Sequence, residues 1–359
     1  MTERQAYLAF NLTERIGAVT LSKLVDSAGS VAAAWDRYPK KVSRTGGAVD
    51  WAGEERLAEK YGVRLVTPAD DDYPRRLRDV PGHPLALYVR GELTALAKPA
   101  VAIIGTRRAT AYGLEQASRL AADLAQAGWS VVSGLALGID AAAHRGALDA
   151  GGVTVGVIGS GLDRFYPEEN RELAREMVRS GGAVVSEFPF GRPADTTTFP
   201  IRNHVVAALA QGVVAVEAPV HSGTLITTGI AADLGRPVMA IPGRVDGRMS
   251  AGCLKLIRDG ATLVRNADDV LEAVGELFPA KKAVATPASS RDPESPAYSS
   301  EEALVMLHVD DDGSTLDELV AATGLPVARV QALAMALRIK GFVRFLPGNR
   351  IAPARPVRR

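Results

Sequence analysis

The stretch VAIIGTRRATAYG, residues 101–113, combines residue types that can bind a phosphate. A β-branched run ends at Gly105, and Thr106 and two arginines follow. The backbone N–H groups of the turn, the hydroxyl of Thr106 and the forked guanidinium of Arg107 can together hold one phosphate. The alternative is an arginine that only forms an ion pair at a strand end. Arg108 can point either to solvent or to a neighbouring phosphate.

The same turn lacks the glycines of a dinucleotide-binding turn. That fingerprint needs three spaced glycines so that the backbone can approach a pyrophosphate. Here Arg107 and Ala109 or Thr110 stand where the later glycines would be. The sequence therefore predicts a site for a single phosphate, with no cofactor.

Two further segments place small and hydroxylated residues after apolar runs, SGLALGID at 133–140 and GSGLD at 159–163. Small residues let a backbone pass close to a ligand. The candidate residues here are Ser133, Gly134, Gly159 and Ser160. We expect Asp140 to cap a helix that carries His144, as a structural pair and not a catalytic one.

A fourth segment, FPIRNH at 199–204, joins an aromatic ring to polar and cationic groups. A base of a single strand can stack on Phe199 while Arg202 takes the adjacent phosphate. Asn203 and His204 complete this candidate group. A core phenylalanine beside a helix cap is the alternative.

A fifth segment, EAPVHSGTLITT at 217–228, predicts a helix that begins near Ser222, Gly223 and Thr224. Free N–H groups and two hydroxyls at a helix start form an anion site. Simple turn chemistry at Pro219 and Gly223 explains the same pattern.

These segments need a parallel sheet to bring them together. From residue 100 onward, β-branched runs alternate with longer helical patterns, which predicts βαβ units covered by helices on both faces. Ligands of such Rossmann-like, doubly wound α/β sheets bind outside the carboxyl ends of the strands. We expect the sheet to span about residues 85–265, within a domain of residues 66–280.

Two smaller domains are expected to flank the sheet. Residues 1–65 predict a small helical domain with helices joined at glycines, and residues 281–299 are a linker rich in Pro, Ser and Ala. Residues 300–359 predict three helices and two strands around a Pro-Gly-Asn turn, the winged-helix pattern. Residues 326–359 carry eight Lys or Arg and no Asp or Glu, which favours either phosphate binding or a solvated helix face with a basic tail.

Composition excludes several classes of function. The net charge is +1, so any nucleic-acid binding must come from local clusters. One cysteine, five histidines without zinc-ligand spacing and the absence of a Gly-x-Ser-x-Gly elbow argue against a disulfide framework, a metal site and a triad hydrolase. We find no leader pattern and no uninterrupted apolar span, so we expect a cytoplasmic protein without membrane insertion.

The order of the motifs resembles the DprA/Smf family of DNA-processing proteins. That family carries a GSR-type turn, SGxAxGID, GxGxDxxYP, SE…FPxRNR, EA…SGTLxTA and AxPG. This chain has GTR, SGLALGID, GSGLDRFYP, SEFPFGRPADTTTFPIRNH, EAPVHSGTLITT and AIPG, over roughly residues 70–265. Departures are His204, where the family has a second arginine, and Leu254, where an asparagine is common.

The resemblance implies a recombination mediator that binds single-stranded DNA as a homodimer and is not an enzyme. It would protect that DNA and load the recombinase RecA onto it despite the single-strand-binding protein, in transformation or repair. By position, Gly105, Thr106 and Arg107 match the phosphate turn. The stretch that meets DNA is matched by Phe199, Arg202 and Asn203. The N-terminal segment is similar to SAM or helix-hairpin-helix domains, and the winged helix could contact duplex DNA or a protein.

Two other functions remain open. Nucleoside-monophosphate phosphoribohydrolases share a phosphate-binding Rossmann core, but Thr227 stands where their PGGxGTxxE motif has the catalytic glutamate, and a threonine supplies no carboxylate. The other is a structural module in which the linker and winged helix act as a protein adaptor.

Overall fold

The computed structural model describes residues 1–39, 41–44, 46–277, 300–310, 313–340, 342–346 and 350–354. The chain divides into two compact units, Met1–Lys281 and Lys282–Arg359. The linker expected at 281–299 and the Pro-Gly-Asn turn lie outside the described residues.

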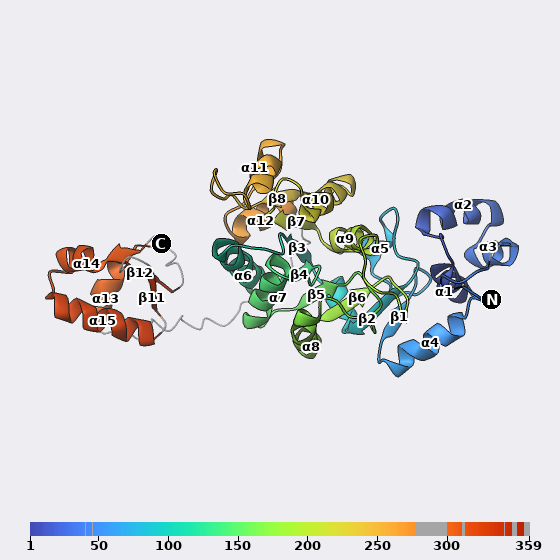
Figure 1. The fold of residues 1–359 in the computed structure, drawn as a ribbon, viewed down its shortest axis with the longest axis horizontal. Helices are drawn as coiled ribbons and strands as arrows, with labels where there is room; N and C mark the ends of the chain where they lie inside the picture. The colour runs from blue at the N-terminus through green and yellow to red at the C-terminus, as the bar shows by residue number, and fades with distance from the viewer. Residues whose placement is uncertain are drawn as a thin grey trace. The chain divides into compact units, whose positions relative to one another are not determined.

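The first unit is built on a nine-stranded sheet in the order β1-β2-β6-β5-β4-β3-β7-β8-β9, and Figure 1 shows β2 to β8 following one another in that order. β1 pairs with β2, and β2 with β6, in antiparallel fashion, while all other pairs are parallel. The predicted Rossmann-like class is confirmed. The strands are β1 (Arg64–Val66), β2 (Leu87–Gly91), β3 (Ala100–Ile104), β4 (Ser130–Ser133), β5 (Thr154–Val157), β6 (Ala183–Ser186), β7 (Gly212–Ala215), β8 (Val238–Ala240) and β9 (Thr262–Leu263).

The strand order reverses at β3. From β3 the chain adds β4, β5 and β6 on one side, and β7 then returns to pair with β3 on the other, with Val101 opposite Gly212. At such a switch point the loops after two neighbouring strands diverge and leave a crevice at their carboxyl ends. The loops after β3, β4 and β7 therefore line one crevice at the carboxyl ends of these strands.

Helices cover both faces because strand side chains alternate. On β3, Val101 and Ile103 pack with α6, α7 and α12, whereas Ala102 and Ile104 pack on the face covered by α9 and α10. The described helices around the sheet are α5 (Arg75–Arg78), η1 (Leu93–Ala97), α6 (Ala111–Gln126), α7 (Ile139–Asp149), η2 (Glu168–Asn170), α8 (Arg171–Arg179), α9 (Thr198–Leu209), α10 (Gly223–Asp233), α11 (Ala251–Arg258) and α12 (Ala267–Leu277).

The N-terminal helices belong to the same compact unit as the sheet. They are α1 (Glu3–Leu12), α2 (Ala18–Ala28), α3 (Val31–Arg37) and α4 (Trp51–Lys60), the last without a counterpart in the expected elements. Buried Glu54 on α4 accepts hydrogen bonds from the Tyr88 hydroxyl on β2 at 2.8 Å and from the Phe190 N–H at 2.9 Å. Buried polar contacts thus join the helical segment to the sheet.

The second unit is a winged helix, as predicted. Its helices are α13 (Ser300–Leu307), α14 (Leu316–Thr323) and α15 (Val327–Ile339), and its strands β10 (Ser314–Thr315), β11 (Val343–Leu346) and β12 (Arg350–Pro353) pair in the order β10-β12-β11. In the described part of the chain, no helix taken singly has the length and apolar character to cross a bilayer. The pair Leu316–Thr323 and Val327–Arg338, bent by 111°, meets those criteria by length and composition only.

Candidate nucleic-acid interface

A cavity lies at the switch point, where the loops after β3, β4 and β7 face α9 and α10. It encloses about 1230 Å³ of space, including open solvent. It brings together most of the expected site residues: Gly105, Thr106, Arg107, Arg108, Gly134, Phe199, Arg202, Asn203, Ser222, Gly223 and Thr224. Gly159 lines a smaller recess that shares Arg107, Gly134 and Phe199 with this cavity.

The GTR turn is fixed by contacts to its neighbours. The Thr106 N–H donates to the Glu217 carbonyl at 2.8 Å, and the Thr106 hydroxyl accepts the Arg108 N–H at 3.2 Å. A Cβ at Gly105 would lie 2.5 Å from Cγ1 of Ile139. This glycine is therefore required by close packing against α7, whatever the ligand.

Arg107 and Phe199 form a stacked pair at the edge of the cavity. The exposed Arg107 guanidinium lies 4.9 Å from the ring centroid of Phe199, and the Tyr166 ring lies 6.2 Å from that of Phe199. A cation over an aromatic face is held by the ring quadrupole and still leaves N–H groups free for an anion. The pair offers stacking surface for a base and charge for a phosphate side by side.

Arg202 does not have the exposed position that the sequence suggested. It is only 6% exposed, and its Nη1 donates to the carbonyls of Gly134 and, at 2.7 Å, Val157. Burial lowers the pKa of Arg202 to about 10, and Asp140 opposes this shift. The guanidinium thus connects the loop after β4 to the end of β5, and the cation beside the Phe199 ring is Arg107.

Ser133 and Asp140 hold the loop after β4 in place. This corrects the expectation that Ser133 binds DNA and that Asp140 caps a helix. The Ser133 hydroxyl is buried and donates to the Ile103 carbonyl at 2.6 Å. Asp140 lies within the first turn of α7, whose N-cap is Gly138, and accepts the N–H groups of Gly134 at 3.1 Å and Ala136 at 3.3 Å. Because these N–H groups already donate to Asp140, they are not free to bind a phosphate, and this loop only forms a wall of the cavity.

Asn170 completes that wall, and no sequence pattern considered above pointed to it. Its Nδ2 donates to the carbonyls of Leu135 at 2.9 Å and Ala136 at 3.1 Å. Leu135 is fully buried and has a positive φ of 52°, a left-handed conformation that costs a branched residue energy. The signal that could have found Asn170 is its place just after the YP motif.

Ser160 and His204 are not among the residues that line the cavity or its recess. Ser160 is fully buried, and its carbonyl accepts a hydrogen bond from the Ser186 hydroxyl at 2.7 Å. Ring atoms of His204 approach Gly82, 3.5 Å from the position a Cβ would take there, and burial lowers the His204 pKa. Both residues connect neighbouring segments and offer little to a ligand in the cavity.

Two helix starts near the switch point differ in their availability to an anion. At α6, the Glu217 carboxylate already accepts the Thr110 N–H at 2.9 Å and the Thr110 hydroxyl at 2.6 Å. At α10, the N-cap Ser222 makes no side-chain capping bond, and its buried Oγ has no hydrogen-bond partner among the described residues. The protein's own carboxylate therefore occupies the α6 start, where dinucleotide-binding folds place a phosphate, and the α10 start stays open.

His144 is buried and neutral. Its Nδ1 lies 2.6 Å from the Thr154 hydroxyl, which itself donates to the Val131 carbonyl at 2.7 Å, so Nδ1 carries the proton. Burial, with a smaller effect of Arg202, lowers the His144 pKa from 6.5 to about 3. The residue is a structural histidine, as expected, and lies in the interior of the fold.

We expect His144 to make stability fall with acidification. Below pH 6.5 the His144 imidazole binds a proton in the unfolded chain, whereas in the folded chain it binds one only near pH 3. The free energy of unfolding therefore falls as the pH is lowered through this window. From about pH 7 to about pH 5.5 the loss attributable to His144 is about 1.3 kcal/mol. Chemical denaturation of the wild type and His144→Gln at both pH values checks this: identical pH slopes would contradict a neutral buried imidazole.

No group of three His, Cys, Asp or Glu side chains within the described residues is arranged to hold a metal ion.

Comparisons with known proteins agree with this fold. The family model of DNA recombination-mediator protein A matches residues 64–275, and that of the DprA winged helix domain matches residues 286–349. Protein Smf of Synechocystis sp. is 31% identical over 396 residues, covering 97% of this chain and 98% of the relative.

Two solved structures are similar. DNA processing protein A (DprA) from Streptococcus pneumoniae has a TM-score of 0.63 and 31% identity, covering 76% of this chain and 98% of that one. DNA processing protein A from Helicobacter pylori, studied for its single-stranded DNA binding mode, has a TM-score of 0.53 and 29% identity, covering 60% and 96%. The chain belongs to the DNA recombination-mediator protein A family, also called DprA or Smf, and its role lies in DNA processing and recombination.

Proposed function

We propose that this protein binds single-stranded DNA in the switch-point cavity. The observation that carries the proposal is the Arg107–Phe199 pair at the edge of the cavity, 4.9 Å from guanidinium carbon to ring centroid. Aromatic stacking beside a cation is the usual chemistry of single-strand binding. The Helicobacter pylori relative, which binds single-stranded DNA, supports the same ligand.

In this proposal, base and phosphate take different parts of the cavity. A base stacks against Phe199 and Tyr166, where the recess lined by Leu137 and Gly159 gives it an apolar surface. A phosphate binds at the start of α10, where the N–H groups of Gly223 and Thr224 have no partner within the helix and Ser222 Oγ makes no hydrogen bond among the described residues.

We propose that the protein is not an enzyme. Thr227 donates to the Gly223 carbonyl at 3.2 Å and supplies no carboxylate. Asp140, which lines the cavity, accepts two backbone N–H groups and lies beside Arg202, so it is committed to the loop after β4. Release of ribose 5-phosphate from AMP would contradict this proposal.

The winged helix offers fewer free cations than its sequence suggests. Arg329 pairs with Glu301, Lys340 pairs with Glu302 at 2.8 Å, and the Arg338 guanidinium lies 4.9 Å from the Phe345 ring centroid. The outward residues of α15 include Val327 and Met335, each about half exposed. We therefore propose that single-strand affinity resides in residues 1–281 and that duplex contact by the winged helix is weak.

The test compares the intact chain with a chain that ends near residue 280, on single- and double-stranded DNA of matched sequence. We expect both proteins to bind the single strand equally and more tightly than the duplex. We also expect affinity to fall steeply with salt, because phosphate binding releases counterions. Preference for duplex in the intact chain, lost on truncation, would place the main interface in the winged helix.

The partners proposed for this function are RecA, the single-strand-binding protein and a second copy of this chain. Bound DNA would be protected and handed to RecA. Assays of RecA filament formation on strands covered by single-strand-binding protein test the loading role. If a saturating concentration of this protein does not accelerate filament formation, the loading role is excluded.

A further inference from the structure

A second groove begins on the other side of the GTRR turn. It lies between α6 and α7, reaches η2 and α8, and encloses about 1110 Å³ of open space. Arg107 and Arg108 line both this groove and the switch-point cavity. The two hollows therefore adjoin at a single turn of the chain.

The chemistry of the groove suits a nucleic-acid strand. Its lining includes Ala141, Ala142 and Leu114, the last 40% exposed, which together offer apolar surface for bases. Arg108 lies at its start, and Arg145 on α7 pairs with the half-exposed Glu176 at 3.2 Å. The acid within the groove, Glu115, stands on α6, on the wall opposite Arg145. Cations at intervals along an apolar surface are the pattern of single-strand sites.

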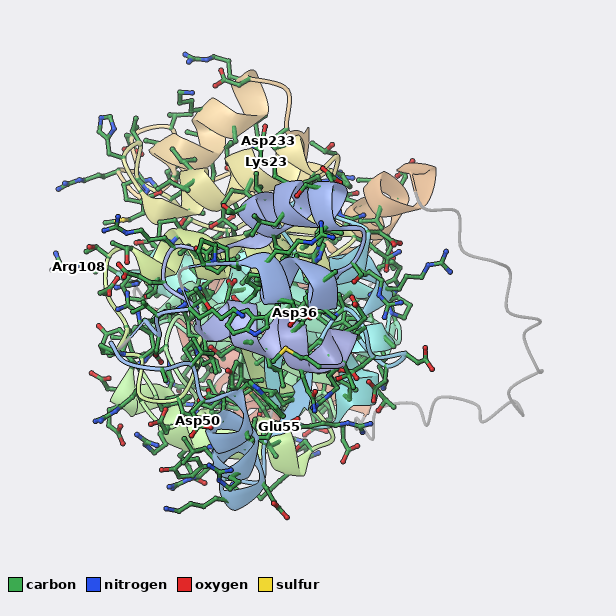
Figure 2. The ribbon with its side chains drawn as sticks, turned by 90° about the vertical axis from the view of Figure 1, so that its right-hand side faces the viewer. Lys23, Asp36, Asp50, Glu55, Arg108 and Asp233 are labelled. Atoms are coloured by element: carbon green, nitrogen blue, oxygen red, sulfur yellow. The ribbon has the colours of Figure 1, made fainter. Side chains whose placement is uncertain are left out.

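Arg108 is placed to make the crossing contact. Its N–H is held by the Thr106 hydroxyl at 3.2 Å, while its side chain is exposed and extends away from the ribbon (Figure 2). Among the described residues no ion pair involves its guanidinium. Arg107 stacks on Phe199 at 4.9 Å. Both arginines line both hollows, so a strand that passes over the turn meets two guanidinium groups in succession.

We propose that single-stranded DNA bound in the switch-point cavity crosses the GTRR turn and continues along the α6–α7 groove, with Arg108 binding the phosphate at the crossing. The inference rests on the proposed function and adds a route for the strand beyond the cavity. Two guanidinium groups on the turn let successive phosphates be neutralised as the backbone passes over it.

The first test measures affinity against oligonucleotide length. We expect Arg108→Ala to weaken binding of an oligothymidylate of about 20 nucleotides about fivefold and to reduce the slope of log affinity against log salt by about 0.7, the value of one phosphate contact. Binding of an oligomer of about six nucleotides, which fills only the cavity, should weaken by a smaller factor, because Arg108 lines the cavity as well as the groove. The matched control is Arg75→Ala, at a side chain 91% exposed on α5.

The outcomes separate this inference from the proposed function. Arg107→Ala should weaken both lengths; if it affects neither, the cavity assignment itself fails. If Arg107→Ala weakens both and Arg108→Ala weakens neither, the cavity stands and the crossing is overturned. Equal weakening of both lengths by Arg108→Ala would mean that Arg108 acts only within the cavity and would also overturn the crossing.

A second test reports on the groove directly. Cys253 is buried and its thiol pKa is raised to about 12, so Leu114→Cys provides a single reactive site for an environment-sensitive fluorophore. We expect saturating 20-mer to change the emission and saturating 6-mer to leave it unchanged. An unchanged signal with the 20-mer overturns the route, and a change only on adding RecA would assign the groove to a protein.

Discussion

Arg202→Ala is expected to lower the free energy of unfolding by about 3–5 kcal/mol, the range for breaking a buried charge pair. The guanidinium is 6% exposed and bonds to the Gly134 and Val157 carbonyls beside Asp140. Removing it leaves two buried carbonyls without their donor and takes the neighbouring cation away from the buried Asp140 carboxylate. Chemical denaturation monitored by far-ultraviolet circular dichroism measures the change.

Arg202→Lys is the matched control, since it keeps the charge and loses the fork of donors. We expect it to be intermediate in stability. Asp140→Asn combined with Arg202→Ala should cost less than the sum of the two single changes, because the residues act on one loop. If Arg202→Ala kept wild-type stability and lost only DNA affinity, Arg202 would be a ligand contact and not a positioning residue.

Arg107→Ala is expected to weaken DNA binding and to leave the stability of the fold nearly unchanged. It should weaken single-strand binding by about 2–3 kcal/mol, on the order of 100-fold at low salt, through the loss of a charged hydrogen-bond donor set and of the cation over the ring. Stability should change by less than about 0.5 kcal/mol, because the side chain is exposed. Fluorescence anisotropy with a labelled oligonucleotide measures the affinity.

Phe199→Leu tests the other half of the pair. It keeps apolar volume and removes the ring, so binding should weaken by about 1–3 kcal/mol, the worth of one stacked base. Arg75→Ala again controls for a general loss of positive charge. An Arg107→Ala variant with wild-type affinity across a salt series would move the interface away from the GTR turn.

Much of the fold could be predicted from the sequence because its signals are local. The runs that became β3 to β8 are rich in β-branched residues and bounded by glycine or proline, and all their residues except Val238 at the start of β8 are buried. The start of α14 carries a capping box between Thr315 and Glu318. β1, β9 and α4 were not anticipated, because two or three strand residues and a largely polar helix leave little periodicity.

The candidate site was predictable in outline. Parallel strands end at one edge, so residues after β3, β4, β5 and β7 had to be neighbours there. Residue type alone could not say which polar groups would face the cavity. Ser133 ends β4 and Ser160 follows β5 at the expected places, yet both side chains are fully buried.

The sequence by itself determined the α/β order, the winged helix and the set of loops that meet at the sheet edge, because these follow from hydrophobic periodicity and turn residues within short windows. Only the tertiary structure decided which polar groups are free to bind a ligand. It places Arg202 in the interior and Arg107 over Phe199, and it brings Glu217, 107 residues from Thr110, to the start of α6. Such choices depend on the pairing of β3 with β7 and the packing of α9, contacts between residues far apart in the chain.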